Sequence, residues 1–267
     1  MKGLAVVVGV VLLAGSVGAQ WLKIPTPGIP RHPDGRPNLE APVPRNADGR
    51  AIIAGLWLPR NFVIGDLRKA MKGGEALPFQ PWAAAVYKTR LDNLGKDDPT
   101  SNCIVGGVPR NDFVPYPFKI IETPGNMVIL YEAIHSYRQI FTDGRALPKD
   151  PNPAWLGYSV GRWEKDVFVV ESSGFNDNVW IDNAGVPATE ELKVTERFVR
   201  KDFGHMDIEI TIDDPKTYTK KWEMVQPLLF QADNEIIEYI CDENNRYFDL
   251  VPHAQPPGRS PARGAKP

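Results

Sequence analysis

Short segments of alternating apolar and polar residues fill the second half of the chain. The clearest runs from His205 to Asp213, where every second residue is apolar and the residues between them are polar. A period of two is typical of a β-strand with one buried and one solvated face. Similar β-branched and aromatic segments, separated by turn residues, predict nine strands, at 118–122, 127–133, 136–142, 156–163, 167–172, 192–200, 205–213, 221–230 and 235–241.

Consecutive strands with short turns predict an antiparallel meander, and its clearest hairpin joins 159–163 to 167–172. A meander of eight or more strands leaves two edges open to aggregation unless the sheet closes. We therefore expect a mainly β fold, a single antiparallel β-barrel of about eight to ten strands between about 118 and 241. One helix is expected over 81–94, because Pro81 precedes a run of helix-forming residues and Gly95 follows it.

The ends of the chain differ in composition from this region. Residues 1–19 combine Lys2, an apolar run and small residues before Gln20, which is the pattern of a secretory signal peptide cleaved after Ala19. The alternative is a membrane anchor, but the run is shorter than the roughly 20 residues that a span needs. We expect a secreted or periplasmic protein with no membrane span in its mature chain. A proline-rich extended strap (20–50), one barrel domain (51–251) and a disordered tail (252–267) would follow.

Composition and charge narrow the classes of function. The 267 residues are 42% hydrophobic and 24% charged, with 31 Lys and Arg against 33 Asp and Glu, which indicates an ordinary globular protein. A formal charge of −2 gives no basic field for nucleic acid. The sequence has no glycine-rich phosphate loop, no dinucleotide fingerprint and no His-Glu-x-x-His motif, so no cofactor is expected.

The two cysteines, Cys103 and Cys241, would lie in an oxidising compartment after export. Cysteines there more often pair than stay free, so a disulfide between them is expected. Two separate buried thiols are the alternative, because sequence does not place their Cα atoms within disulfide reach.

Two resemblances to known families bear on the fold. The tripeptide Gly55-Leu56-Trp57 resembles the Gly-x-Trp signature of the first lipocalin strand, and a strand meander behind it is similar to the calycin class of ligand-holding barrels. This resemblance implies a calycin-like or lipocalin-like barrel that encloses a small molecule.

Several motifs are also similar to those of an uncharacterised family of secreted bacterial proteins, and the likeness covers most of the chain. This resemblance implies secretion and a single fold, and it transfers no catalytic residue. The motifs are Tyr137-Arg138-Gln139-Ile140-Phe141-Thr142-Asp143-Gly144-Arg145, Asp150-Pro151-Asn152-Pro153, Trp155-Leu156-Gly157-Tyr158-Ser159-Val160-Gly161-Arg162-Trp163, Gly174-Phe175-Asn176-Asp177, Glu196-Arg197-Phe198, Asp202-Phe203-Gly204-His205-Met206 and Tyr239-Ile240-Cys241.

One eight-residue stretch gathers groups that can perform acid and base chemistry. It contains Tyr131, Glu132, His135, Tyr137 and Arg138, which supply phenols, a carboxylate, an imidazole and a guanidinium. If these groups face a cavity, His135 could act as base, Tyr131 or Tyr137 as proton donor and Arg138 as anion stabiliser. The alternative is a cross-strand ion pair between Glu132 and Arg138 on the solvent face.

Two weaker patterns involve Ser159 and His205. Gly157-Tyr158-Ser159-Val160-Gly161 matches the nucleophile elbow, but the following residues predict strand, turn and strand where an elbow needs a helix. Glycines that let aromatic neighbours pack in a hairpin are the alternative. His205 shares a strand face with Asp207 and Glu209, which could bind a metal but also suit a solvated face, and no metal site is predicted.

A long polar loop from Gly174 to Asn183 could form a lid or binding element, with Asp177 and Asp182 as acid and base; a self-capped turn is the alternative. Aromatic residues could line a pocket, although they are equally suited to the core. The candidate ligand-binding residues are Trp155, Tyr158, Trp180, Asn176, Asp177 and His205.

The sequence thus favours a barrel that binds a small, largely apolar or aromatic molecule. The alternative is a cofactor-independent acid/base enzyme, such as an isomerase, cyclase, lyase or hydrolase, and a third class binds a protein partner through its strap and tail. An inward-facing His135 and Arg138 would favour the enzyme, and a lumen filled by side chains would favour the partner-binding protein. Strand facing and oligomeric state stay open at this point, because a slip of one residue inverts every facing.

Overall fold

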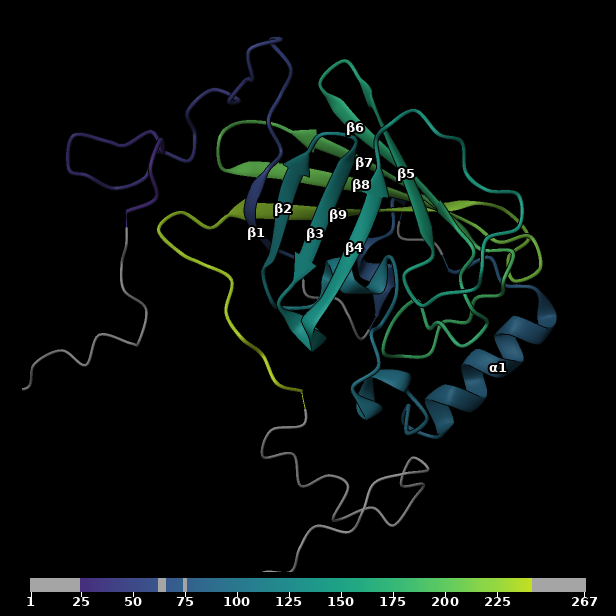
Figure 1. Ribbon diagram of the computed structural model, residues 1–267. Helices are drawn as coiled ribbons and strands as arrows, with labels where there is room; N and C mark the ends of the chain where they lie inside the picture. The colour runs from purple at the N-terminus through teal and green to yellow at the C-terminus, as the bar shows by residue number, and fades with distance from the viewer. Residues whose placement is uncertain (1–24, 62–65, 74–75, 242–267) are drawn as a thin grey trace, which may run out of the picture.

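The computed structural model describes residues 25–61, 66–73 and 76–241. Nine strands form one closed barrel in which each strand pairs with its neighbours in sequence, and the last strand pairs with the first (Figure 1). The strands are β1 (Gly55–Pro59), β2 (Phe118–Thr123), β3 (Asn126–Tyr131), β4 (Ser136–Phe141), β5 (Tyr158–Glu164), β6 (Val167–Ser173), β7 (Lys193–Arg200), β8 (His205–Asp213) and β9 (Trp222–Phe230).

Alternation places one face of each long strand in the interior of the barrel. In β8, Met206, Ile208, Ile210 and Ile212 are all buried and the residues between them are partly exposed, as the sequence predicts. The β5–β6 hairpin is also confirmed: Glu164 pairs with Val167 across a two-residue turn. The mainly β class and the closed barrel are therefore confirmed.

The first and last predicted strands need correction. The barrel begins at β1, near 55 rather than 118, and β1 fills the gap between β9 and β2. Residues 235–241, predicted as a strand, contain none. Because β1 and β8 already occupy both edges of β9, the closed sheet leaves no edge for a tenth segment.

The barrel is not wholly antiparallel, which is a second correction. Strands β4 and β5 run parallel, pairing Ile140 with Ser159 and Phe141 with Val160. The long connection 142–157 returns the chain to the end of the barrel where β4 began, so β5 starts in the same direction. Parallel neighbours need such a long connection, whereas the hairpin turns elsewhere give antiparallel pairs.

The predicted helix is α1 (Pro81–Asp92), which ends two residues before the predicted boundary. Its buried residue is Ala83, and Arg90 packs over the ring of Trp180 at 4.3 Å, which docks the helix on the loop after β6. Four 3-10 helices, η1 (Leu67–Ala70), η2 (Pro99–Asn102), η3 (Arg110–Phe113) and η4 (Ala133–His135), lie in the connections.

The strap covers the end of the barrel at which β1 begins, called here the strap end. Ala41 and Leu39 accept hydrogen bonds from the backbone N–H groups of Phe203 and Gly204, in the turn between β7 and β8. Two turns of the strap form ion pairs with the barrel region. Arg31 pairs with Asp233, after β9, and Arg45 pairs with Asp166, in the β5–β6 turn. The predicted signal peptide (1–19) and tail (252–267) lie outside the described residues.

The Gly-x-Trp tripeptide lies in β1 at the strap end. Trp57 is fully buried, and its indole N–H donates to the carbonyl of Ile53 at 2.9 Å. Gly55 has a φ of +138°, and a Cβ atom there would lie 2.5 Å from the ring of Phe230. This position therefore requires glycine for its backbone conformation and for the close ring.

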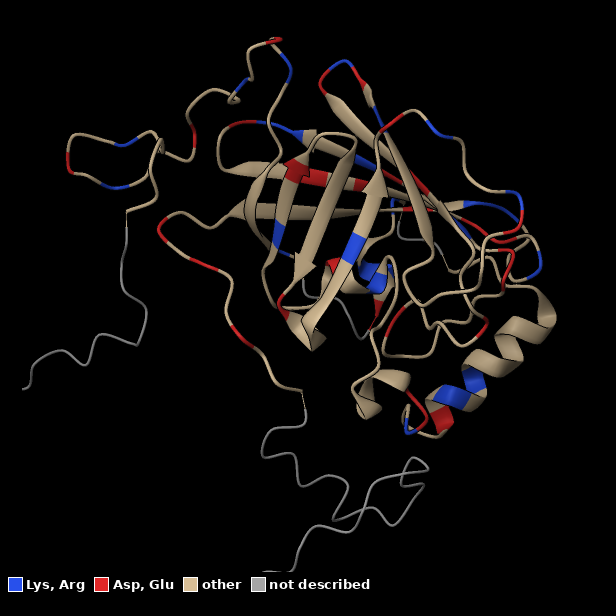
Figure 2. Cartoon of the chain, viewed as in Figure 1, with Lys and Arg blue, Asp and Glu red and all other residues tan. Residues whose placement is uncertain are grey.

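The two signs of charge are interspersed over the strands and loops (Figure 2). Many of them pair on the outer face, as in Arg162 with Glu171 and Lys201 with Asp207. Within the described part of the chain, none of the helices has the length and apolar character needed to cross a membrane.

Candidate functional site

Six polar side chains meet inside the barrel, and we call this group the interior polar centre. Each is at most 3% exposed. Five come from inward-facing strand positions and one from η3. The six residues are Asp112, Tyr131, Arg138, Ser159, Ser172 and Glu196.

Arg138 forms the middle of the centre. Its guanidinium donates to both carboxylate oxygens of Glu196, at 2.9 Å to Oε1 and through a shorter contact to Oε2. It also donates to the hydroxyl oxygens of Ser159 at 3.1 Å and Ser172 at 2.8 Å, and these two oxygens lie 2.8 Å apart. Burial alone would lower the pKa of Arg138, but the charge and hydrogen bonds of Glu196 hold it above its ordinary value. Arg138 and Glu196 therefore form a buried, bidentate ion pair.

Asp112 adds a second carboxyl group beside this pair. Its Oδ1 accepts a hydrogen bond from the Tyr131 hydroxyl at 3.0 Å, whereas its buried Oδ2 has no hydrogen-bond donor. Burial raises the pKa of Asp112 well above its usual range, and the charge of Glu196 raises it further against the opposing effect of Arg138. Burial and the charge of Asp112 likewise raise the pKa of the Tyr131 phenol. These effects favour a proton on Asp112.

The charges balance only with that proton. Two carboxyl groups and one guanidinium would leave a net negative charge in a low-dielectric interior, which is strongly unfavourable. A proton on Asp112 removes this charge, and a hydrogen bond from it to Glu196 would give the bare Oδ2 a partner. The arrangement can donate a proton, accept one, and stabilise an anion through Arg138.

The η3 segment brings Asp112 into the barrel. The Gln226 side chain of β9 donates to the carbonyl of Asp112 and to that of Asn61, both at 3.0 Å. Arg110 donates to both carboxylate oxygens of Asp98, at 2.8 and 2.5 Å, and this pair is also buried. Asp112 therefore sits on a segment fixed at both of its sides.

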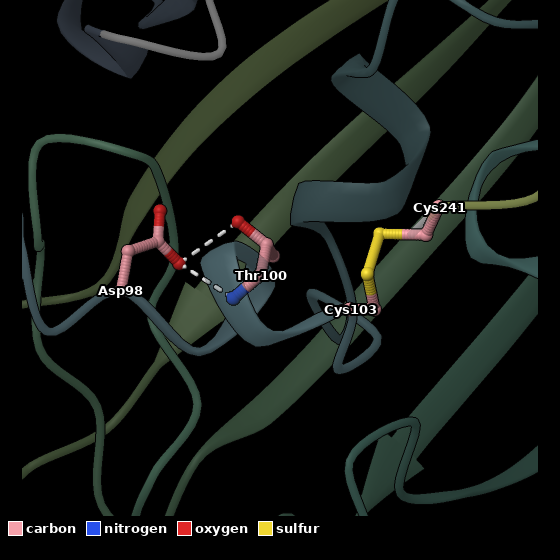
Figure 3. Close-up of a disulfide and its surroundings, with 4 residues drawn as sticks. All are labelled: Asp98, Thr100, Cys103 and Cys241. Atoms are coloured by element: carbon pink, nitrogen blue, oxygen red, sulfur yellow. Dashed lines mark hydrogen bonds between the residues drawn. A yellow bond between two sulfur atoms is a disulfide. The ribbon is translucent and has the colours of Figure 1, made fainter. Parts of the chain in front are cut away.

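The same region carries the disulfide that the sequence predicts. Cys103 and Cys241 are bonded, with Cα atoms 5.7 Å apart (Figure 3). Figure 3 also shows Asp98 accepting hydrogen bonds from the backbone N–H and the hydroxyl of Thr100, at 2.9 and 3.0 Å, which caps η2. The bond joins the segment before η3 to the chain beyond β9, and not to a strand.

The stretch from Tyr131 to Arg138 divides between the two faces of the barrel wall. Tyr131 and Arg138 enter the interior polar centre. The carboxylate of Glu132 accepts from the backbone N–H of Ile237 at 3.1 Å, and exposed His135 accepts from that of Tyr239 at 3.1 Å. Tyr137 is 69% exposed.

The suggested ion pair between Glu132 and Arg138 is not formed, because Arg138 faces inward and binds Glu196. His135 and Tyr137 are exposed whereas Tyr131 and Arg138 are buried, so the structure does not bring these five residues together.

Ser159 lies within a strand, as its surroundings predict, and not at a nucleophile elbow. The glycine two residues later is needed for packing, since a Cβ atom on Gly161 would lie 2.5 Å from the Phe168 ring. Ser159 still belongs to the centre, as a hydrogen-bond acceptor for Arg138.

The loop from Gly174 to Asn183 packs into the molecule. Trp180 and Asp182 are buried, and Asp182 accepts from the backbone N–H groups of Val186 at 3.0 Å and Leu67 at 3.4 Å. Burial raises the pKa of Asp182, and these hydrogen bonds oppose the rise. Asn176 caps the backbone of Asn178 at 3.0 Å, whereas Asp177 is exposed.

The remaining candidates lie apart from one another. Trp155 packs against the core, and Tyr158 stacks on Phe141 with its hydroxyl 3.0 Å from Arg145. His205 pairs with Asp202 on the outer face at 2.8 Å. Among residues 25–61, 66–73 and 76–241, no three His, Cys, Asp or Glu side chains group as metal ligands.

A hollow of about 860 Å³ lies on the other side of the wall, between residues 147–153 and β6 to β8. Its lining is rich in charges of both signs, including Lys149, Glu171 and Lys193. Ser172 belongs both to this lining and to the interior polar centre.

Sequence reasoning missed Asp112, Ser172 and Glu196. Glu196 did carry a signal, because it shares the inward face of β7 with Val194 and Phe198. A carboxylate in an otherwise apolar register needs a buried partner. Asp112 carried none, since it lies in a short 3-10 turn whose position depends on contacts distant in sequence.

Comparison of the chain with protein-family models, with curated proteins and with solved structures finds no match.

Proposed function

We propose that the protein binds a small, largely apolar or aromatic molecule inside the barrel, with the polar group of that molecule at the interior polar centre. The observation that carries this proposal is the interior polar centre itself, in which Oδ2 of Asp112 is buried with no donor other than a proton shared with Glu196. Such groups of buried polar atoms are uncommon in folded proteins and call for an explanation. A hydrogen-bond donor on a ligand would replace that proton.

The surrounding wall suits the rest of such a molecule. Binding pockets are mainly apolar with a few well-placed polar groups. Buried rings and aliphatic side chains form one core cluster in the same molecule, and they include Phe118, Ile129, Phe168, Phe198 and Met224. The aromatic side chains among them can contact a flat ring directly.

Entry of a ligand requires movement of the segment that carries Asp112. The six side chains of the centre are at most 3% exposed, so a ligand does not reach them without such movement. The η3 segment is the part of the centre that is not a barrel strand. Its outward movement would break the hydrogen bond from Gln226 to the Asp112 carbonyl but no strand pair.

Two further parts of the proposal concern fold type and location. Fully buried Trp57 in the first strand supports a calycin-like barrel, although the parallel β4–β5 pair is a departure from an up-and-down meander. The Cys103–Cys241 disulfide supports a secreted or periplasmic location, where such bonds persist. The proposed export signal lies in residues 1–19, outside the described part of the chain.

Native mass spectrometry of the chain from Gln20 to Pro267 tests the proposal. The protein is incubated with an extract of its producing cells, and bound masses are compared between wild type, Ser172→Ala and the outer-face control Glu171→Gln. We expect one bound species, weakened by Ser172→Ala and unchanged by Glu171→Gln. A bound species that both variants weaken equally would contradict interior binding. The absence of any bound species would also contradict it and would favour a protein partner.

Acid/base catalysis on the bound molecule is the second candidate function. The raised pKa of Asp112 beside the Tyr131 hydroxyl favours it, because enzymes shift carboxyl pKa values in this direction to hold a proton at neutral pH. Asp112 would be the acid, Tyr131 a further donor and Arg138 the anion stabiliser. Tyr131→Phe should then retain the bound species and lose its conversion, measured as the mass of the released molecule. Unaltered conversion by that variant would remove Tyr131 from the reaction.

A further inference from the structure

The hollow outside the barrel wall is built as a groove, which we call the outer groove. Its volume of about 860 Å³ lies within the range of about 300–1,000 Å³ that ligand pockets occupy. Its floor is the outer face of β6 to β8, and the segment 147–153 forms the opposite wall. Pro151 packs this wall against Gly174, where a Cβ atom would lie 2.3 Å from the proline ring. Because Gly174 also has a φ of +72°, this position requires glycine, and the contact that positions the wall depends on it.

The floor of the outer groove is polar. Thr195 of β7 lies opposite Thr211 of β8, and Lys193 lies opposite Asp213 in the neighbouring outward-facing row. All four residues line the groove. Within the part of the chain that the structure describes, the hydroxyls of Thr195 and Thr211 have no hydrogen-bond partner. The floor therefore offers two unoccupied groups, each of which can donate and accept a hydrogen bond.

The charged side chains of the outer groove are unevenly paired. Four of its five carboxylates form ion pairs: Glu171 with Arg162 at 3.2 Å, Asp213 with Lys221 at 2.9 Å, and Glu190 and Glu191 with Lys216 at 2.6 and 3.4 Å. Asp150 is the fifth. Lys149 of the wall and Lys193 of the floor have no carboxylate partner among residues 25–61, 66–73 and 76–241. Two ammonium groups are thus available to a ligand with a few carboxylates, whereas the many charges of both signs do not suit a dense polyanion such as nucleic acid.

Other classes of ligand fit the outer groove less well than a sugar does. A peptide that adds a strand needs a free sheet edge, but β7 is paired with β6 on one side and with β8 on the other. A largely apolar molecule needs a mainly apolar lining. A sugar has several hydroxyls that donate and accept hydrogen bonds, and its C–H faces can pack on the rings of Pro148 and Pro153 in the wall.

We propose that the outer groove binds an acidic oligosaccharide, whose sugar rings carry carboxylates. Lys149 and Lys193 bind these carboxylates from the two sides of the groove, and Thr195 and Thr211 exchange hydrogen bonds with the ring hydroxyls. This site lies outside the barrel wall, so the proposal goes beyond the function proposed for the interior polar centre.

Titration calorimetry with three probes tests the proposal. Trigalacturonate, its neutral counterpart galactotriose and the peptide tri-glutamate are each titrated into the chain from Gln20 to Pro267 at pH 7. Galactotriose has the sugar rings without the carboxylates, and tri-glutamate has carboxylates without the sugar rings. We expect trigalacturonate to bind about tenfold or more tightly than either of the others, because only it uses both the lysines and the hydroxyls.

Three variants locate the binding. The double variant Lys149→Gln/Lys193→Gln removes both charges and should weaken trigalacturonate about tenfold or more. Thr195→Val keeps the shape of the side chain but removes its hydroxyl, and it should weaken trigalacturonate about threefold. Lys96→Gln replaces an exposed lysine outside the lining and should leave binding unchanged. None of the four positions is buried, so all three variants should fold.

The outcomes separate this proposal from interior binding. Galactotriose or tri-glutamate that binds as tightly as trigalacturonate overturns the proposal, and so does the absence of binding by all three probes. Equal weakening by Lys96→Gln and by the double variant would show unspecific attraction of charge and would also overturn it. The interior species from the cell extract should bind the double variant as it binds wild type, so the proposed function stands or falls separately.

Discussion

Arg138 and Arg200 are buried at opposite ends of the same barrel, and they are held in opposite ways. Arg138 has a bidentate carboxylate partner, Glu196. Arg200 donates instead to the backbone carbonyls of Ile52, Asp202 and Phe203.

The rings of the strap end complete the surroundings of Arg200. Its guanidinium carbon lies 4.9 Å from the centroid of the Trp57 ring and 5.7 Å from that of Phe230. Burial lowers the pKa of Arg200 to about 10, against a small opposing effect of Asp202, whereas the pKa of Arg138 is raised. At the strap end, the cation Arg200 therefore binds backbone carbonyls and aromatic rings. The interior polar centre instead contains two carboxyl groups, Asp112 and Glu196, and one cation, Arg138. Only the second arrangement leaves a group that a ligand or a proton can occupy.

The largest predicted effect is on stability when Glu196 is replaced. Glu196→Gln removes the bidentate carboxylate partner of the buried Arg138 charge, so the free energy of unfolding should fall by about 3–5 kcal/mol. Urea unfolding with the disulfide intact measures this. The control Glu171→Gln breaks an exposed pair and should change stability by less than about 1 kcal/mol. Equal effects of the two variants on stability would contradict the burial of the Arg138–Glu196 ion pair.

Replacing Arg200 should lower the free energy of unfolding by less than replacing Glu196 does. Arg200→Met removes the donors of three carbonyls but leaves no unpaired charge, so we expect a loss of about 2–3 kcal/mol in the same unfolding experiment. A loss larger than that of Glu196→Gln would reverse the ranking of the two ends.

The proton of Asp112 predicts a dependence of stability on pH. A carboxyl group whose pKa is raised by folding binds more protons in the folded state than in the unfolded state. Its contribution is therefore complete below the unfolded pKa of about 4 and declines as pH rises towards the folded pKa, by at most about 1.4 kcal/mol per pH unit. The stability difference between wild type and Asp112→Asn should shift in favour of the variant from pH 4 upwards. A difference constant across this range would contradict a proton held by Asp112.

The smallest effect is expected in the strap. Arg45 pairs with Asp166, but both side chains are about half exposed, so solvent screens the pair. Arg45→Ala should leave the urea midpoint unchanged within error. A clear decrease would show that the strap turns contribute to stability of the barrel as strongly as the buried arginines.

The sequence predicted those parts of the fold that depend on local alternation. The β8 pattern from His205 to Asp213 shows which face is buried because apolar residues recur every two positions. The five residues of β1 are too few to show a period, so only the likeness of Gly55-Leu56-Trp57 indicated that strand. Residues 235–241 have the composition of a strand, yet sheet closure excludes them, and closure is not a local property.

The site was predicted only where its residues lie close together in the sequence. Tyr131 and Arg138 were identified from their chemistry, but their facing depends on the register of β3 and β4, which places Ile129 opposite Arg138. Their partners lie elsewhere in the chain: Glu196 is 58 residues from Arg138, and Asp112 is 19 residues from Tyr131. Only the closed barrel brings these groups together.

The protonation state of Asp112 is the central claim of this account, and carbon-13 NMR of carboxyl-labelled aspartate measures it directly. Asp112→Asn assigns the resonance, and exposed Asp166, whose pKa Arg45 lowers, serves as an internal reference. The account predicts that the Asp112 carboxyl is protonated at pH 7 and titrates well above the range of the other aspartates. An Asp112 signal that is ionised at pH 7 and titrates near 4, as ordinary aspartates do, would contradict it.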